Sequence, residues 1–181
     1  INELFALIKE RHLVVQRVPV EKINRITRKN HQGVVAFLSA VTYYNIEEVV
    51  PVLFEEGINP FLIVLDGITD VRNFGAIART CDCAGVNAII IPERNSVSVN
   101  ADAIKTSAGA LNYVPVCREK NLVNVVKFLK SSGYKVVGAS EKSSVNYTLV
   151  DYTGPVALIL GAEDKGISND LLKLCDEFVS I

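Results

Sequence analysis

The 181-residue chain contains no methionine, no tryptophan and only two histidines. Its four cysteines form no CxxC pair and have no histidine close by in the sequence; they are Cys81, Cys83, Cys117 and Cys175. Structural zinc sites use cysteine and histidine pairs at short spacing. We therefore expect reduced, partly buried thiols and no metal site.

Long apolar runs are also absent. No stretch approaches the ~20 consecutive apolar residues that cross a bilayer. Residues 1–12 lack the order of charged, apolar and small-residue segments that marks a signal peptide. We expect a cytoplasmic protein without a membrane span. Residue 1 is not methionine and enters a helical pattern without a cap, so we also expect a longer natural chain.

Two glycine patterns that bind phosphate are missing as well. No GxGxxG follows a first strand, and GxxxxGK[ST] does not occur. Their absence argues against a Rossmann dinucleotide enzyme and against a P-loop enzyme. The hydrophobic content of 49% is enough for a sizeable core, either in one domain or in one domain with a small appendage.

The charge is unevenly distributed. The net charge is −1, but residues 1–33 hold seven basic against three acidic side chains, which gives +4 there and −5 in the remainder. A basic segment before an acidic body favours binding of a phosphate backbone by that segment, although a solvated helix face would have the same charge. Cations and amides suited to RNA cluster at Arg28, Lys29, His31 and Gln32. A structural loop role is the alternative for His31.

The front of the chain predicts a small, incomplete α/β module. The expected elements are a helix at 3–12, a strand at 13–20, a short basic helix at 21–27 and a glycine turn leading into a strand within 28–40. A connector follows, with Asn45 as a helix cap and Pro51 as a kink. We expect three parts: a partial RNA-binding domain at 1–44, a linker at 45–59 and a catalytic domain at 60–181.

The catalytic part begins with a β-α-β unit. A buried strand at 61–68 leads through a polar turn into a helix at 74–85, and a second strand follows at 87–92. Asn73 is the expected N-cap and Gly85 the expected stop of that helix. Ligands of parallel sheets lie beyond the carboxyl ends of the strands, which is where residues 66–73 fall.

Gly75 and Arg79 lie one turn apart on this helix. A glycine there leaves space beside the guanidinium, as a substrate approaching the backbone would need. The alternative is that Gly75 permits close helix packing and that Arg79 is an ordinary surface residue.

Strands and helices alternate through the rest of the chain. The expected helices span 101–111, 121–133 and 169–176, and the expected strands span 112–116, 134–140, 156–160 and 177–181. This order predicts an α/β fold with a mostly parallel sheet and helices on both faces. Gly161 and Gly166 predict a tight turn after one strand, and Glu163 adds a carboxylate that we expect at the same sheet edge as Arg79.

The pattern NxGAIxRT at 73–80, followed by KTSAGAL at 105–111 and GxExxG at 161–166, resembles the SpoU or TrmH-like branch of the SPOUT RNA methyltransferases. The resemblance covers 61–181. Residues 1–44 resemble the C-terminal half of the ribosomal-protein-like domain that precedes the catalytic domain in ribosomal members. The chain is most similar to RlmB-type enzymes, which methylate a guanosine 2′-hydroxyl of 23S ribosomal RNA.

The resemblance implies S-adenosylmethionine as cofactor, ribosomal RNA as partner, a C-terminal trefoil knot, and a homodimer whose active sites draw on both subunits. The matching catalytic positions are Arg79, Asn73 and Glu163. Leu160, Gly161 and Ile181 match the cofactor pocket. The family's third motif lies beyond residue 181, so the knot segment is incomplete here.

The chemistry restricts what Arg79 can do. Its guanidinium stays protonated at physiological pH, so it is a poor base. We expect Arg79 to clamp a phosphate and stabilise the developing alkoxide, with the proton passing to that phosphate, to water or to another group. A transfer-RNA guanosine 2′-O-methyltransferase and a catalytically silent RNA-binding or ribosome-assembly protein are the alternatives.

Overall fold

The computed structural model describes residues 8, 10, 15–36 and 39–180. The chain divides into two compact units, Ile1–Leu38 and Ser39–Ile181. The expected helix at 3–12 lies almost entirely outside the described residues, and so does Ile181.

The second unit is built on one parallel sheet. Its strands follow the order β1-β4-β3-β2-β6-β5-β7. Every recorded pair of neighbouring strands is parallel, as expected for strands joined by crossovers. The strands are β1 (Tyr43–Tyr44), β2 (Phe61–Asp66), β3 (Ala88–Pro92), β4 (Val116–Glu119), β5 (Lys135–Ala139), β6 (Val156–Gly161) and β7 (Glu177–Val179).

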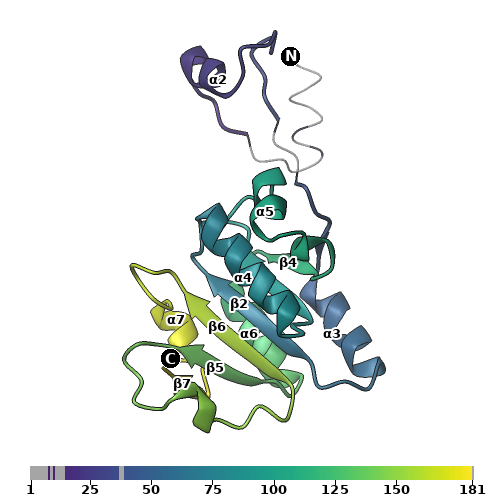
Figure 1. Cartoon of the computed structure of the whole chain (residues 1–181), viewed down its shortest axis with the longest axis vertical. Helices are drawn as coiled ribbons and strands as arrows, with labels where there is room; N and C mark the ends of the chain where they lie inside the picture. The colour runs from purple at the N-terminus through teal and green to yellow at the C-terminus, as the bar shows by residue number, and fades with distance from the viewer. Residues whose placement is uncertain (1–7, 9, 11–14, 37–38, 181) are drawn as a thin grey trace. The chain divides into compact units, whose positions relative to one another are not determined.

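Helices cover both faces of the sheet, which confirms the predicted α/β layering (Figure 1). Within β2, Leu62 and Val64 pack on one side, whereas Ile63 and Leu65 pack on the other. This alternation buries β2 on both faces and explains its continuous apolar run. The first face carries α3 (Ile46–Glu55), α6 (Leu122–Ser131) and α7 (Asn169–Leu172), and the second carries α4 (Val71–Cys83) and α5 (Ala101–Thr106).

The predicted helix at 101–111 is shorter than expected. It ends at Thr106, and a separate 3-10 turn, η1, spans Ala110–Asn112. The backbone between them passes through left-handed conformations, with φ of 51° at Ala108 and 89° at Gly109, which an α-helix cannot contain. The strand predicted at 112–116 is therefore wrong, because β4 begins only at Val116.

Structure of the second unit begins before the expected linker, because β1 lies in the last residues of the expected 1–44 domain, and it continues through the linker itself as α3. β1 pairs with β4, and α3 follows directly. The expected cap is present, since Asn45 Oδ1 accepts a hydrogen bond from the Glu47 N–H at 2.9 Å. Ile46 and Val50 lie one turn apart and are buried, so α3 is held against the sheet by its apolar face.

The first unit contains α2 (Val20–Ile26), which matches the short basic helix expected at 21–27. The strand predicted at 13–20 is wrong over its described part, because residues 15–19 have no regular structure and Val20 already begins the helix. Residues 34–36 are likewise not in a strand. Val15, Val20 and Val34 are exposed, so the described residues of these two segments present no buried apolar face of the kind a strand would pack on a core.

The cysteines are unpaired thiols. Burial raises the pKa of both Cys81 and Cys117 to about 12, so these two are unreactive at neutral pH. In the described parts of the chain, no three His, Cys, Asp or Glu side chains gather into a group that could hold a metal ion. Among the helices of those same parts, none has the length and apolar character needed to cross a membrane.

Candidate active site at the carboxyl edge of the sheet

The carboxyl ends of β2 and β6 form a topological switch point. The two strands pair in register, with Asp66 opposite Gly161. β2 leads to α4 on one face of the sheet, and β6 leads to α7 on the other, so the two loops diverge beyond the strand ends. A crevice between diverging loops is where open parallel sheets bind ligands.

Two hydrogen bonds join the loops at this edge. Asp66 Oδ2 accepts from the Ser168 N–H at 2.7 Å, across 102 positions of sequence. The Val97 N–H donates to the Ile68 carbonyl at 3.0 Å. This bond connects the loop that follows β3 to the loop that follows β2. The sequence predicts residues 66–73 at this edge, but it does not predict the pairing of Asp66 with Ser168, because no local pattern connects positions 102 residues apart.

The turn after β6 is tight, as its glycines predict. The Gly166 N–H donates to the Ala162 carbonyl at 2.7 Å, and Gly166 adopts a left-handed φ of 66°. A Cβ on Gly161 would lie 2.0 Å from the Gly166 carbonyl carbon. Glu163 is exposed within this turn, and Leu160 is half-buried at the end of β6.

The cap of α4 is Asp70, so the prediction that Asn73 is the N-cap is wrong. Asp70 Oδ1 accepts from the N–H groups of Arg72 and Asn73, each at 2.9 Å. Asp70 has extended backbone angles, whereas Asn73 already lies in the first helical turn with an exposed side chain. Gly85 follows the last turn with a φ of 70°, which confirms the predicted stop.

This correction predicts unequal stability effects for two neighbouring polar residues. Asp70→Ala removes the acceptor of two N–H groups and should lower the free energy of unfolding by about 1 kcal/mol. Asn73→Ala keeps that acceptor and should leave the stability nearly unchanged. Urea unfolding followed by circular dichroism measures both. A larger loss for Asn73→Ala than for Asp70→Ala would contradict the assignment of the cap.

Gly75 is buried between α4 and α5. A Cβ at this position would lie 2.2 Å from Thr106 Oγ1 and 2.6 Å from Thr106 Cβ. The interpretation of Gly75 as space for a substrate is therefore wrong, and the close-packing alternative is confirmed. The glycine is required because the two helices approach each other more closely than a side chain permits.

Gly75→Ala should therefore destabilise the fold. The extra methyl must displace Thr106, a change typical of overpacked cores that cost about 1–3 kcal/mol. Gly154→Ala is the matched control, because a Cβ on Gly154 meets nothing within 4 Å. The measurement is the urea midpoint of each variant, and equal midpoints would refute the packing role of Gly75.

Arg79 does not lie at the strand ends. It is exposed, and it follows Val71 by eight residues, which places it about 12 Å along the axis of α4 from the start of the helix. Neither Arg79 nor Glu163 forms a hydrogen bond or ion pair within the described chain. No hydrogen bond or ion pair of the described chain therefore joins Arg79 to Glu163, and their common place at one sheet edge stays a prediction.

The predicted RNA-contact residues of the first unit differ in their surroundings. Arg28, Lys29 and Gln32 are exposed, whereas His31 is half-buried. Both ring nitrogens of His31 have partners: Nδ1 accepts from the Gly33 N–H at 2.9 Å, and Nε2 lies 2.8 Å from Asn24 Oδ1.

Two protein-family models match the chain, and their ranges agree with this architecture. The model of the SpoU rRNA Methylase family matches residues 60–181, which contain both loops of the switch point. The chain belongs to the SpoU rRNA Methylase family. A second model, described as RNA 2′-O ribose methyltransferase substrate binding, matches residues 1–44 of this SpoU family member.

Relatives of this SpoU protein carry TrmH names. It is 34% identical over 181 residues to a TrmH family tRNA/rRNA methyltransferase of Staphylococcus saprophyticus, covering 100% of this chain and 73% of that protein. It is 31% identical over 180 residues to the TrmH family tRNA/rRNA methyltransferase YacO of Bacillus subtilis, covering 99% and 72%.

Solved structures share the fold. The SpoU methyltransferase AviRb of Streptomyces viridochromogenes superposes with a TM-score of 0.62 at 26% identity, over 68% of this chain and 50% of AviRb. The TrmH/SpoU tRNA modifying enzyme of A. aeolicus has a TM-score of 0.61 at 28% identity, over 68% and 63%. The SpoU chain described here thus matches about half the length of AviRb. AviRb has also been solved in complex with AdoMet.

Proposed function

We propose that this SpoU family protein transfers a methyl group from S-adenosylmethionine to the 2′-hydroxyl of a guanosine in large-subunit ribosomal RNA. The observation that carries the proposal is the switch point between β2 and β6, where the two motif-bearing loops meet. We assign RNA binding to residues 1–44 and catalysis to residues 60–181, joined through residues 45–59.

The residues at the end of β6 fit the adenosyl part of this cofactor. An adenosyl group needs an apolar surface and backbone groups for its ring nitrogens and ribose. Leu160 supplies a half-buried apolar side chain, and Gly161 leads into a turn whose residues 163–166 are exposed. We assign Leu160, Gly161 and Ile181 to the cofactor pocket. When bound, the cofactor supplies an electrophilic methyl group on a sulfonium.

Side chains of this protein bind the substrate phosphate, stabilise charge on the attacking oxygen and orient the ribose. Arg79 clamps the phosphate beside the target ribose and stabilises negative charge on the attacking oxygen. The proton of the hydroxyl passes to that phosphate or to water, because a guanidinium cannot accept it. Asn73 orients the ribose or Arg79, and Glu163 fixes the turn that holds the cofactor.

The position of Arg79 supports a site shared between two copies of the chain. The residue is exposed and lies two turns away from the start of α4, on a helix face shared with Asn73, Ala76 and Thr80. We therefore propose a homodimer in which Arg79 of one copy completes the crevice of the other. Sedimentation of the intact protein tests this, and a monomer at micromolar concentration would contradict it.

Substrate choice is tested with labelled S-adenosylmethionine. The intact protein is incubated with unmodified large-subunit ribosomal RNA and, separately, with total transfer RNA, and the products are digested to nucleosides. We expect 2′-O-methylguanosine from ribosomal RNA alone, because a separate basic module precedes the linker and we assign the choice of RNA to that module. Label on transfer RNA alone would support the transfer-RNA enzyme, and cofactor binding without any transfer would support an RNA-binding or assembly protein.

A further inference from the structure

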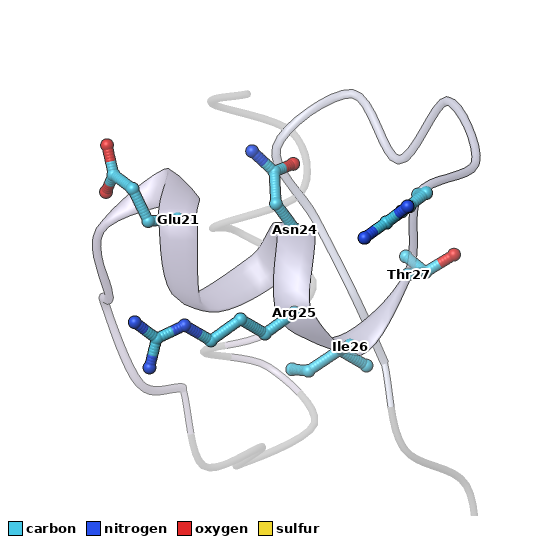
Figure 2. A pocket seen from close by; sticks show the side chains of 6 residues that line it. Glu21, Asn24, Arg25, Ile26 and Thr27 are labelled. Carbon is cyan, nitrogen blue, oxygen red and sulfur yellow. The ribbon is translucent and has the colours of Figure 1, made fainter.

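The first unit has a basic pocket on α2 and the turn that follows it. Residues 15–36 carry five basic side chains against one acidic side chain, a net charge of +4. A shallow pocket lies on this surface (Figure 2), lined by Glu21, Asn24, Arg25, Ile26, Thr27 and Arg28. Two of the five cations, Arg25 and Arg28, line it together with one acid, Glu21, so the lining of the pocket carries a net charge of +1.

His31 fixes Asn24 at this pocket. The Nδ1 atom of His31 accepts from the Gly33 N–H at 2.9 Å, so it carries no proton. Nε2 therefore carries the proton and donates to Asn24 Oδ1 at 2.8 Å. With its oxygen engaged, Asn24 presents only its NH₂ group, and that group has no hydrogen-bond partner within the described chain.

The turn that carries His31 is held in an unfavourable conformation. Gln32 has a left-handed φ of 48°, which non-glycine residues adopt rarely, and Gly33 follows with 81°. Such a conformation persists when surrounding contacts fix it. The turn is held by the Gly33 N–H, which donates to His31 Nδ1, and by the Val34 N–H, which donates to the His31 carbonyl at 2.9 Å. His31 Nε2 then orients the Asn24 amide before any ligand arrives.

We propose that this pocket binds one unstacked nucleotide of a single-stranded RNA segment. Arg25 and Arg28 bind its flanking phosphates, and the Asn24 NH₂ group donates to an acceptor on the base edge. His31 is a positioning residue that acts through Asn24. The exposed side chain of Ile26 offers an apolar surface to the sugar or base. Unstacked nucleotides in loops present both their edges and their phosphates in this way.

The proposal rests on RNA being the substrate, and it adds a specific site to the basic surface. On a diffuse basic surface, every exposed cation would contribute about equally to RNA affinity. At a nucleotide pocket, RNA affinity depends mainly on the residues that line the pocket. Lys22 separates the two cases. It is an exposed cation of the same helix, but it does not line the pocket.

The first experiment measures binding of the full chain to a fluorescent 12-nucleotide single-stranded RNA over a series of potassium chloride concentrations. We expect Arg25→Ala and Arg28→Ala each to weaken binding on the order of tenfold. Each should also reduce the slope of log K against log salt by about 0.7, the value for one phosphate contact on a single strand. Lys22→Ala should retain most of the affinity. Equal losses for all three variants would overturn the proposal.

The second experiment tests Asn24 and His31 with uniform RNAs of each base. Asn24→Ala removes the NH₂ donors without adding a charge, so preference among the bases should fall while the salt slope stays the same. His31→Ala releases Asn24 and should reduce the same preference. Wild-type preference in both variants would refute the base contact.

Cofactor binding and methyl transfer separate this proposal from the proposed function. Pocket variants should bind S-adenosylmethionine as the wild type does, because the cofactor site lies in the second unit. If the wild type methylates RNA and the arginine variants bind RNA like Lys22→Ala, the pocket is refuted and the function stands. If RNA binding depends on the pocket but no methyl is transferred to any RNA, the function is refuted and the pocket stands.

Discussion

Replacing Arg79 by alanine should reduce methyl transfer to RNA on the order of 10²–10³-fold, the loss typical when one group that stabilises an oxyanion is removed. The side chain is exposed and has no partner within the described chain, so its loss should not affect folding. Affinity for S-adenosylmethionine should be unchanged, because Leu160 and Gly161 form the assigned cofactor site. Single-turnover transfer and equilibrium cofactor binding measure the two quantities separately.

Arg79→Lys distinguishes a planar clamp from a simple positive charge. Lysine keeps the charge but loses the two-pronged geometry that matches a phosphate, so most of the loss should remain. Lys127→Ala on the exposed side of α6 is the control for removal of a surface cation, and it should transfer methyl at the wild-type rate. Near-normal turnover of Arg79→Lys would contradict the clamp.

The order of strands and helices was predictable because local sequence determines it. The apolar runs of β2, β3 and β6 are continuous since each strand is buried on both faces. Asn121 caps α6 as expected, and Gly133 ends the following turn with a φ of 90°. One or two local residues therefore suffice to predict where such a helix begins or ends, without knowledge of any distant contact.

The cap of α4 could not be assigned from residue type alone. Asp70 and Asn73 are both good N-cap residues, and they stand three positions apart. The choice depends on where the backbone turns into the helix. The backbone turns at Asp70, so the helix begins at Val71 and the Asn73 side chain is left exposed in the first turn. An exposed asparagine in the first turn can contact a substrate, whereas a capping one is already engaged.

Contacts between distant segments were the least predictable part of the site. Asp66 bonds to Ser168, and Gly75 packs on Thr106, yet neither pair has a local pattern that names its partner. The His31–Asn24 contact spans only seven residues, but residue type alone does not predict it either. The RNA contact expected for His31 stays a prediction. The sequence motifs identified the loops of the site, but tertiary packing decides which side chains remain available to a ligand.

Gly161→Ala should disrupt the cofactor site through backbone contacts alone. A Cβ on Gly161 would lie 2.0 Å from the Gly166 carbonyl carbon and 2.2 Å from the Ile167 nitrogen. No rotamer change can relieve contacts with backbone atoms, so the turn must move as a whole. Overpacking of this kind costs about 1–3 kcal/mol, and if the cost falls on the binding conformation, affinity for S-adenosylmethionine should fall about 10- to 100-fold.

Gly154→Ala is the matched control for this substitution, since its added methyl meets nothing within 4 Å. Titration calorimetry with S-adenosylmethionine should give wild-type affinity for the control and the weakened value for Gly161→Ala. Circular dichroism should show that both variants keep the sheet, because the turn lies beyond the end of β6. Wild-type affinity in Gly161→Ala would mean that the turn after β6 does not hold the cofactor. A loss confined to Gly161→Ala would place the adenosyl group against this turn, beside the Asp66–Ser168 contact that joins it to the loop after β2.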